Sequence, residues 1–297
     1  MPVLTRRNFG AAALSFGVAP HLAAAGGTWP ALRVAAFKRS LARLEQDSQG
    51  RLGVHVLDSA SGQQAGHRSD QRFLMLSSFK TLAAALVLAR HDRGEDRLDR
   101  PIPIQASDLI EYAPVVERHV GASLTLAQLC EATLTTSDNA AANLILASYG
   151  GPAALTRFMR SLGDTVTRHD RTEPTLNQPD PHAPLDTTSP RAMATTLRAL
   201  LFGDALSPAS RQQLQAWLIA NTTGGKRLRA GLPPDWQVGE KTGTATRVGA
   251  NDAGFARPPH GTPVLISAYL QTTRIAPAQR DEILATVGRL AAELVQG

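Results

Sequence analysis

The sequence predicts an α/β fold with an added all-helical part, in which an antiparallel five-stranded sheet is flanked by terminal helices and a helical domain is inserted. Three observations predict it. Strand-like patterns occur near the start of the chain and again near its end, the long stretch between them has helical patterning, and an amphipathic helix is predicted at each end. Because the outer segments are alike in type, they can pair into one sheet, and the middle then forms a second domain.

The first outer segment reads as a helix followed by a hairpin. Residues 29–50 place apolar side chains among charged ones at helical spacing, which predicts an amphipathic helix. Residues 51–58 alternate as a half-buried strand does. A turn at residues 59–62 leads to a second strand near residues 64–67, so the two strands are expected to form a hairpin.

The middle of the chain is mainly helical in pattern, with one exception. Residues 77–218 carry helical periodicity that is punctuated by glycines and prolines. Residues 170–190 contain five prolines, which excludes a regular helix there. A long ordered loop inside a compact domain is more often functional than accidental, so we expect this loop to contribute to a site.

Strand patterns return near the C-terminus and complete the sheet. They are followed by a last amphipathic helix over residues 277–295. The three predicted strands span residues 236–242, 248–256 and 264–272. The predicted division assigns residues 27–68 and 220–297 to the sheet domain, and residues 69–219 to the helical domain that contains the proline-rich loop.

The composition indicates a folded protein and gives no support to a nucleic-acid partner. Apolar residues make up 43% of the chain and charged residues 19%, a balance that argues against intrinsic disorder. The net charge is +6, yet the basic residues are scattered and no run of them is interleaved with aromatic residues. We therefore attribute the charge to a solvated, arginine-rich surface. Only four of the basic residues are lysines, so the position of each lysine is informative.

The N-terminus resembles a twin-arginine export signal. Arg6 and Arg7 precede a stretch of small and apolar residues over 11–19, and the alanines at 23–25 suit a cleavage site. The alternative, a membrane anchor, needs about 20 apolar residues, and this stretch is shorter. We expect residues 1–26 to be removed and the mature chain to be periplasmic or secreted, without membrane contact.

The first chemical pattern is S-x-x-K at Ser77 and Lys80. If a helix begins here, the two side chains share one face and the serine lies at the positive end of the helix dipole. A buried amine can lose its proton and act as a base, while N-terminal amides can stabilise an oxyanion. The residues after Lys80 are nearly all apolar up to position 89, so this helix is expected to be buried. The alternative is a helix cap followed by a surface lysine.

Two further patterns lie downstream. Residues 137–139 read S-D-N, which alone could be an ordinary helix cap. Residues 241–243 read K-T-G at the end of a strand-like run, where the glycine permits a ligand to approach the backbone closely. A coincidence of all three patterns in this order, with two of the four lysines inside them, would be rare.

In this combination the chain resembles the class A β-lactamases, which carry S-x-x-K, S-D-N and K-T-G in this order. A fourth pattern agrees, because residues 173–177 inside the proline-rich loop match the E-x-x-L-N of that family, the part that separates its hydrolases from penicillin-binding proteins. The resemblance runs from about residue 30 to the C-terminus. It implies the serine β-lactamase and D,D-peptidase type of fold, hydrolysis of the amide bond of penicillins and cephalosporins, and antibiotic resistance.

The resemblance also implies the catalytic roles. Ser77 would be the nucleophile and Lys80 its hydrogen-bonded partner, while Glu173 and Asn177 would hold a water beside the acyl bond. Ser137 would relay a proton to the departing lactam nitrogen. Whether lysine or glutamate is the base in acylation stays open, whereas deacylation through the glutamate is accepted.

Substrate contacts follow from the same resemblance. Asn139 would hold both Lys80 and the substrate side-chain amide, and the backbone amides of Ser77 and Thr244 would form the oxyanion hole. Tyr112 would be an aromatic wall at the mouth of the pocket. The expected contacts of the substrate carboxylate are Lys241, Thr242 and Thr244 around Gly243, with Arg227 as a planar donor and Arg229 as its rival.

A further resemblance is structural. Arg171 and Asp186 match an ion pair of the family that pins the ends of the loop. Two family disulfides are missing. Cys130 is the only cysteine and its usual partner position holds Ala84, so we expect Cys130 to be buried as a small apolar residue. The cysteine pair of a carbapenem-hydrolysing group is replaced by Leu76 and Ala245, which weakens the expectation of carbapenemase activity.

Two other functions are weighed against this one. A cell-wall D,D-peptidase would share the nucleophile and the K-T-G strand, but the loop that carries Glu173 argues against it. A β-lactam sensor would stay acylated and is normally fused to membrane helices, which the sequence does not show. The histidines form no metal-binding pattern, and the serine mechanism needs neither metal nor cofactor. We expect a monomer that acts on a small-molecule β-lactam.

Overall fold

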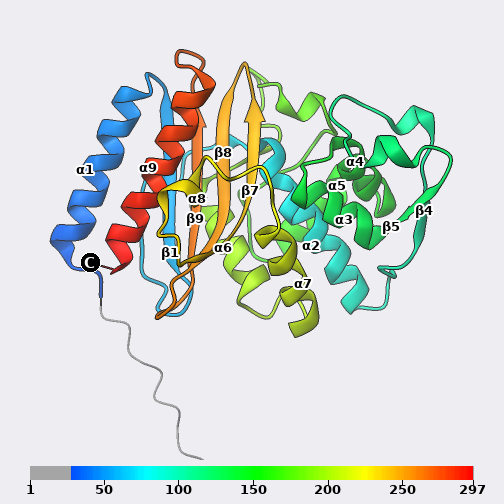
Figure 1. The fold of residues 1–297 in the computed structure, drawn as a ribbon, viewed down its shortest axis with the longest axis horizontal. Coiled ribbons are helices and arrows are strands. Elements are labelled where there is room, and N and C mark those ends of the chain that lie inside the picture. The colour runs from blue at the N-terminus through cyan, green and yellow to red at the C-terminus, as the bar shows by residue number, and fades with distance from the viewer. Residues whose placement is uncertain (1–27, 297) are drawn as a thin grey trace, which may run out of the picture.

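A computed structural model describes residues 28–296, so the predicted export signal over residues 1–26 lies outside the described residues. One five-stranded sheet stands at the centre of the fold, with strand order β2-β1-β9-β8-β7 and antiparallel neighbours throughout (Figure 1). The predicted sheet is therefore confirmed. Its strands are β1 (Arg51–Asp58), β2 (Gln64–His67), β7 (Gln237–Ala245), β8 (Gly249–Arg257) and β9 (Val264–Gln271).

The terminal helices cover one face of this sheet. Helix α1 (Ala31–Asp47) and helix α9 (Pro277–Gln296) lie side by side against it, as predicted, and the short helix α8 (Leu228–Gly231) packs on α9 (Figure 1). The apolar layer between them includes Leu41 and Leu284, both fully buried. In Figure 1 these terminal helices lie at the left of the sheet, on the side away from the inserted helices.

The other face of the sheet is covered by the inserted helices. Helix α6 packs against β1 and β9, and α7 packs against β7, while the remaining helices extend the second apolar core beyond the sheet (Figure 1). The boundaries at residues 68 and 220 stay a prediction. The helices of this part are α2 (Phe79–Asp92), α3 (Leu126–Thr135), α4 (Asn139–Ser148), α5 (Pro152–Ser161), α6 (Pro190–Leu201) and α7 (Pro208–Ile219).

Two expectations about strands need correction. Strand β1 was expected to be half-buried, but every residue after Arg51 is buried, because helices cover both faces of the sheet. The inserted part also contains short strands that the helical pattern did not predict. They form two small antiparallel ladders, β3 (Phe73–Leu74) with β6 (Thr187–Thr188), and β4 (Pro101–Pro103) with β5 (Ser123–Thr125). Such short ladders carry too few residues for a periodic signal.

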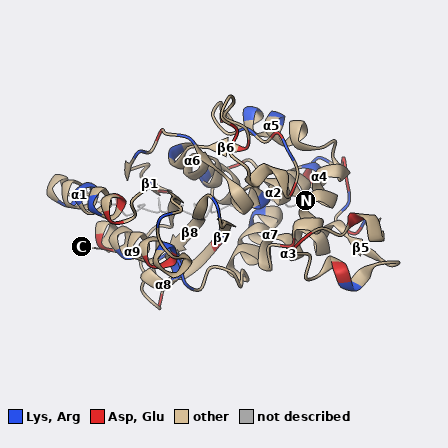
Figure 2. Cartoon of the chain, turned by 90° about the horizontal axis from the view of Figure 1, so that it is seen from above, with Lys and Arg blue, Asp and Glu red and all other residues tan. Residues whose placement is uncertain are grey.

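The charged surface is mixed in sign. Figure 2 shows Lys and Arg spread over many elements, with Asp and Glu among them. Several arginines pair with neighbouring acids, as Arg68 does with Glu45 and Arg100 with Asp96. Within residues 28–296, no helix is long and apolar enough to cross a membrane.

Helices α8 and α9 approach each other through glycine. A Cβ at Gly288 of α9 would lie 2.4 Å from the carbonyl oxygen of Leu228, and a Cβ at Gly231 of α8 would lie 1.7 Å from the carbonyl oxygen of Ala285. Both obstacles are backbone atoms, so the two helices can touch only where no side chain intervenes. This contact also fixes Arg227, the residue before α8.

We expect Gly288→Ala to lower the free energy of unfolding by roughly 1 to 3 kcal/mol, because the clash with the α8 backbone exceeds the gain of about 1 kcal/mol in helix propensity. Urea unfolding would measure the change. Gly225→Ala is the control, since a Cβ there meets nothing within 4 Å and should change the stability by less than about 0.5 kcal/mol. Equal stabilities of the two variants would contradict the expectation.

Candidate active site

One cavity of about 540 Å³ lies where the inserted part meets the edge strand β7. Most of the residues singled out from the sequence line it. They are Ser77, Ser137, Asn139, Glu173, Asn177, Thr242, Thr244 and Tyr112. Lys80 and Lys241 lie just behind the wall and are fully buried, so the four sequence patterns converge on one place.

Ser77 stands in a tight turn at the head of α2. The turn η1 (Leu76–Ser78) is a 3-10 helix, and the α-helix proper begins at Phe79. Leu76 has a left-handed backbone, with φ of 48°, directly before the serine. A leucine rarely adopts this conformation, so its buried side chain must hold the turn in place.

Lys80 is enclosed by acceptors from two other segments. Its Nζ donates to the carbonyl oxygen of Ser137 at 2.7 Å, to Ser137 Oγ at 3.2 Å and to Asn139 Oδ1 at 2.6 Å. A carboxylate oxygen of Glu173 lies 3.5 Å away. Burial lowers the pKa of Lys80 to about 8, against the opposing effect of Glu173 and Asp138.

The expected hydrogen bond between Ser77 and Lys80 is not present in the described chain, and this expectation is corrected. The three N–H donors of Lys80 are taken by Ser137 and Asn139. Ser77 Oγ instead points to Glu173 Oε1, at 3.5 Å. Ser77 and Lys80 therefore each contact the carboxylate of Glu173, and they form no hydrogen bond with each other.

Glu173 is held in place by two asparagines. Its carboxylate Oε2 accepts from Asn177 Nδ2 at 2.6 Å. Its backbone N–H and C=O are both bonded to the side chain of Asn143 in α4, at 3.0 Å each. Asn143 was missed from the sequence, because nothing in an apolar helix marks which asparagine faces a loop. The peptide bond between Glu173 and Pro174 is cis.

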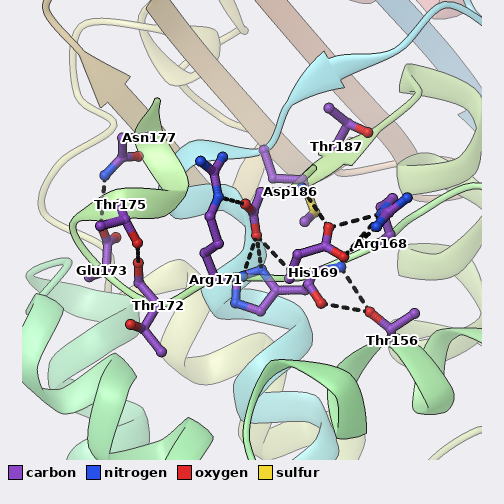
Figure 3. A network of polar contacts seen from close by, with 12 residues as sticks. Thr156, Arg168, His169, Arg171, Thr172, Glu173, Thr175, Asn177, Asp186 and Thr187 are labelled. Carbon is purple, nitrogen blue, oxygen red and sulfur yellow. Dashed lines mark hydrogen bonds and ion pairs between the residues drawn. The ribbon is translucent and has the colours of Figure 1, made fainter. Parts of the chain in front are cut away.

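The ends of the loop are joined by a buried carboxylate (Figure 3). Asp186 is fully buried; its Oδ2 accepts from Arg171 Nε at 2.6 Å, and its Oδ1 accepts from the backbone of Asp170 and Arg171. The expected pair of Arg171 and Asp186 is thus present. His169 lies beside it, with Nδ1 3.4 Å from Asp186 Oδ1, and burial lowers its pKa to about 4.

The S-D-N segment connects the lysine to the mouth of the cavity. Asp138 is buried, caps α4 by accepting from the N–H of Ala141, and also accepts from the N–H groups of Val115 and Val116. Asn139 donates to the carbonyl of Glu111, and its own N–H donates to the carbonyl of Tyr112. These bonds place the ring of Tyr112, which is 56% exposed, at the cavity rim.

The K-T-G segment forms the opposite wall. Burial lowers the pKa of Lys241 well below its usual value, and the positive charge of Lys80 adds to this effect. The sequence predicts that Gly243 allows a ligand to approach the backbone closely. In the structure the turn before α2 lies against this glycine. A Cβ there would lie 2.9 Å from Leu76 Cβ and 3.1 Å from the backbone nitrogen of Ser77. The glycine therefore lets β7 approach the turn that carries Ser77.

The two candidate arginines have different partners. Arg227 donates to Thr244 Oγ1 at 2.7 Å, to the carbonyls of Gly243 and Asn251, and to Asp281 at 2.7 Å. Arg229 instead pairs with the buried Glu240, at 2.6 Å, and neither of these residues lines the cavity. The structure thus connects Arg227 to the site through Thr244 and leaves Arg229 outside it.

Two other expectations concern groups away from the mechanism. Cys130 is fully buried and unbonded, as expected for a small apolar residue, and Ala84 is also buried. Over residues 28–296, no group of three or more His, Cys, Asp and Glu side chains could hold a metal ion.

Comparison with known proteins places these features in a family. The model described as "Beta-lactamase enzyme family" matches residues 36–297. Beta-lactamase L2 of Stenotrophomonas maltophilia is 45% identical over 302 residues, which cover 99% of this chain and 100% of that protein. The Beta-lactamase of Streptomyces albus G is 46% identical over 86% of this chain and 83% of that protein.

Solved structures agree with the sequences. The structure of an ancestral (GNCA) class A beta-lactamase is 57% identical, with a TM-score of 0.84, and covers 86% of this chain and 98% of its own. A beta lactamase from Xanthomonas campestris is 50% identical, with a TM-score of 0.87, over 89% of this chain and 98% of its own.

We expect acid to destabilise the fold through a buried histidine, His169, among other groups. An unfolded histidine takes up a proton near pH 6.5, whereas His169 in the folded chain does so only near pH 4, so stability is lost as the pH falls through this window. The loss attributable to His169 between pH 7 and 4.5 should be roughly 2 to 3 kcal/mol. Urea unfolding at both pH values would show a smaller loss in His169→Leu. An equal loss in both proteins would refute the assignment.

Proposed function

Because the chain belongs to the class A beta-lactamase family of serine hydrolases, we propose that it hydrolyses penicillins and cephalosporins through an acyl-enzyme on Ser77. The observation that carries the mechanism is the position of one carboxylate. Glu173 Oε1 lies 3.5 Å from both Ser77 Oγ and Lys80 Nζ, so a single group can serve the nucleophile and the lysine.

In the acylation step, Ser77 Oγ attacks the lactam carbonyl carbon and loses its proton. A C–O bond forms and the carbonyl oxygen becomes an oxyanion, for which the backbone amides of Ser77 and Thr244 are the proposed donors. The close approach of β7 to the turn at Gly243 supports this pairing. The geometry favours Glu173 as the acceptor of the serine proton, because the donors of Lys80 already have partners.

In the same step the lactam C–N bond breaks and the nitrogen takes up a proton. Ser137 Oγ is the proposed proton donor to the nitrogen, because it lines the cavity and is itself 3.2 Å from Lys80 Nζ. Burial lowers the pKa of this lysine to about 8, so its ammonium can give up a proton more readily than an exposed lysine. The hydroxyl of Ser137 then recovers its proton from Lys80. The proton that Glu173 took from Ser77 passes to Lys80, whose Nζ lies 3.5 Å from Glu173 Oε1, so that Glu173 is again a carboxylate before deacylation.

In deacylation, water attacks the ester carbon, the C–O bond to Ser77 breaks, and the serine recovers its proton. Glu173 is the proposed base and Asn177 its partner in holding the water. Asn177 Nδ2 fixes one carboxylate oxygen, while Asn177 Oδ1 is buried and has no hydrogen-bond donor among the described residues. This oxygen can therefore accept a hydrogen bond from the attacking water.

The opposite wall is proposed to bind the carboxylate of the substrate. Lys241, Thr242 and Thr244 lie on one strand. Arg227 donates a hydrogen bond to the hydroxyl of Thr244 and so fixes its position. Since the remaining donors of Arg227 go to Asp281 and to two backbone carbonyls, we assign it to orienting Thr244.

Two further proposals come from the sequence. We propose that the N-terminal segment directs export through the twin-arginine route to the periplasm or the medium, where β-lactams are met. The paired Arg6 and Arg7 support it, and a double substitution to lysine should retain the protein in the cytoplasm. We also propose that the mature enzyme is a monomer, which gel filtration with light scattering would test.

Replacing Glu173 with alanine should stop deacylation and trap the acyl-enzyme, because acylation can continue more slowly with Lys80, whose pKa burial lowers to about 8, as the base. We expect kcat on a chromogenic cephalosporin to fall on the order of 10³-fold, because the general base of hydrolysis is lost. Intact mass should then show one adduct, located on Ser77 by peptide mapping. Glu117→Ala, which removes an exposed carboxylate away from the cavity, is the control and should turn over normally.

The same experiment separates the rival functions. Steady turnover by the wild type supports the hydrolase. A single stoichiometric burst from the wild type would indicate a sensor, and turnover only of D-Ala-D-Ala peptides would indicate a peptidase. Absence of an adduct on Ser77 in Glu173→Ala would contradict the proposed mechanism.

A further inference from the structure

His169 occupies an unusual position between two segments of the active site. It lies in the loop before Glu173, is 2% exposed, and stacks on the ring of Phe79 with centroids 4.3 Å apart and planes inclined by 21°. Phe79 is the residue that precedes Lys80 and begins α2. The imidazole therefore contacts the helix of the nucleophile and lysine from within the loop of the carboxylate.

The backbone of His169 is fixed independently of its ring. The hydroxyl of Thr156 in α5 accepts from the N–H of His169 at 2.9 Å and donates to its C=O at 2.8 Å (Figure 3). Because both backbone groups are held, the ring cannot move away from Phe79 without a change in the loop itself. The ring thus acts as a spacer of fixed thickness.

The far edge of the ring meets the buried carboxylate that closes the loop. Its Nδ1 lies 3.4 Å from Asp186 Oδ1, which is longer than a good hydrogen bond, and neither ring nitrogen has a hydrogen-bond partner. The carbonyl of Asp186 accepts from the N–H of Met75, two residues before Ser77. The ring is therefore enclosed by contacts that lead to both sides of the site.

We propose that His169 is a positioning residue for deacylation, whose ring sets the separation between helix α2 and the loop that carries Glu173. The proposal rests on the proposed acyl-enzyme mechanism. Ring nitrogens without partners contribute no hydrogen bond to stability, so the stack on Phe79 is the contact that a functional role would use. Deacylation needs Glu173 placed against both the ester and water, whereas in acylation Lys80 can also accept the serine proton. Deacylation is thus more sensitive to a shift of the loop than acylation.

Protonation would alter this arrangement in a defined way. The charged groups facing the ring are Asp186, Asp170 and Arg171, all from the loop, while α2 presents the Phe79 ring and α5 the Thr156 hydroxyl. An imidazolium would draw Asp186 Oδ1 toward itself, away from the backbone N–H groups it now accepts from. Acid should therefore loosen the loop.

The test separates the two chemical steps in matched variants. With a chromogenic cephalosporin, we expect His169→Leu to lower the deacylation rate about tenfold and the acylation rate by less than about threefold. As acyl-enzyme accumulates, kcat and KM should fall together and kcat/KM should stay nearly constant. His169→Phe keeps a stackable ring and should recover deacylation to within about threefold of the wild type at pH 7.5.

His55→Leu is the control. His55 is a second buried histidine, 1% exposed on β1, with a pKa that burial lowers to about 4, and it lies away from the loop. The variant His55→Leu should change neither the acylation rate nor the deacylation rate. In the wild type the deacylation rate should fall more steeply at acidic pH than in His169→Phe, because only the wild type has the imidazole that can take up a proton next to Asp186.

The outcomes are distinguishable from a failure of the mechanism. If Glu173→Ala traps an adduct on Ser77 while His169→Leu deacylates at the wild-type rate, or slows both steps equally, the role of His169 is refuted and the mechanism stands. If no variant forms an adduct on Ser77, the mechanism itself fails. Should His169→Leu not fold, His169→Met fills the same space with a flexible chain, and the same tenfold change in deacylation is expected.

Discussion

The burial of a single ammonium group, that of Lys80, is the constraint on which the rest of the site depends. A buried charge without partners costs several kcal/mol, so the fold must supply acceptors where the lysine lies. Ser137 and Asn139 supply three hydrogen bonds, and Glu173 supplies the opposite charge. These acceptors come from the α3–α4 junction and from the proline-rich loop. Satisfying one lysine therefore brings the segments of the mechanism together.

The patterned parts of the fold could be predicted from the sequence, and the unpatterned parts could not. The five strands and the terminal helices carry clear periodicity, and all of them are found close to their predicted bounds. The two-residue strands β3 and β6 carry none, because two residues cannot show a period. Nor could the burial of β1 on both faces be foreseen, since it depends on helix α6, which follows more than a hundred residues later.

The site shows the same division between local and tertiary information. The identities of the residues were given by short patterns, and the structure brings those residues to one cavity. The hydrogen-bond partners of these residues could not be predicted from the short patterns. Arg227 and Arg229 are two residues apart, and only the positions of Thr244 and Glu240 on β7 distinguish them. Asn143 and His169 were likewise not identified, because the partner of each, the backbone of Glu173 and the ring of Phe79, lies far away in the sequence.

The two buried lysines of the cavity differ in how many of their donors have partners, and this difference separates their roles. All three N–H donors of Lys80 have acceptors within the protein, so it has none left for a ligand and is suited to moving a proton between its neighbours. Lys241 donates, among the described residues, only to the carbonyl of Thr242. Since an ammonium group has three donors, two remain. The side chain of Lys241 is fully buried and does not line the cavity, whereas Thr242 and Thr244 of the same strand do. We propose that the substrate carboxylate is the group that satisfies the two remaining donors.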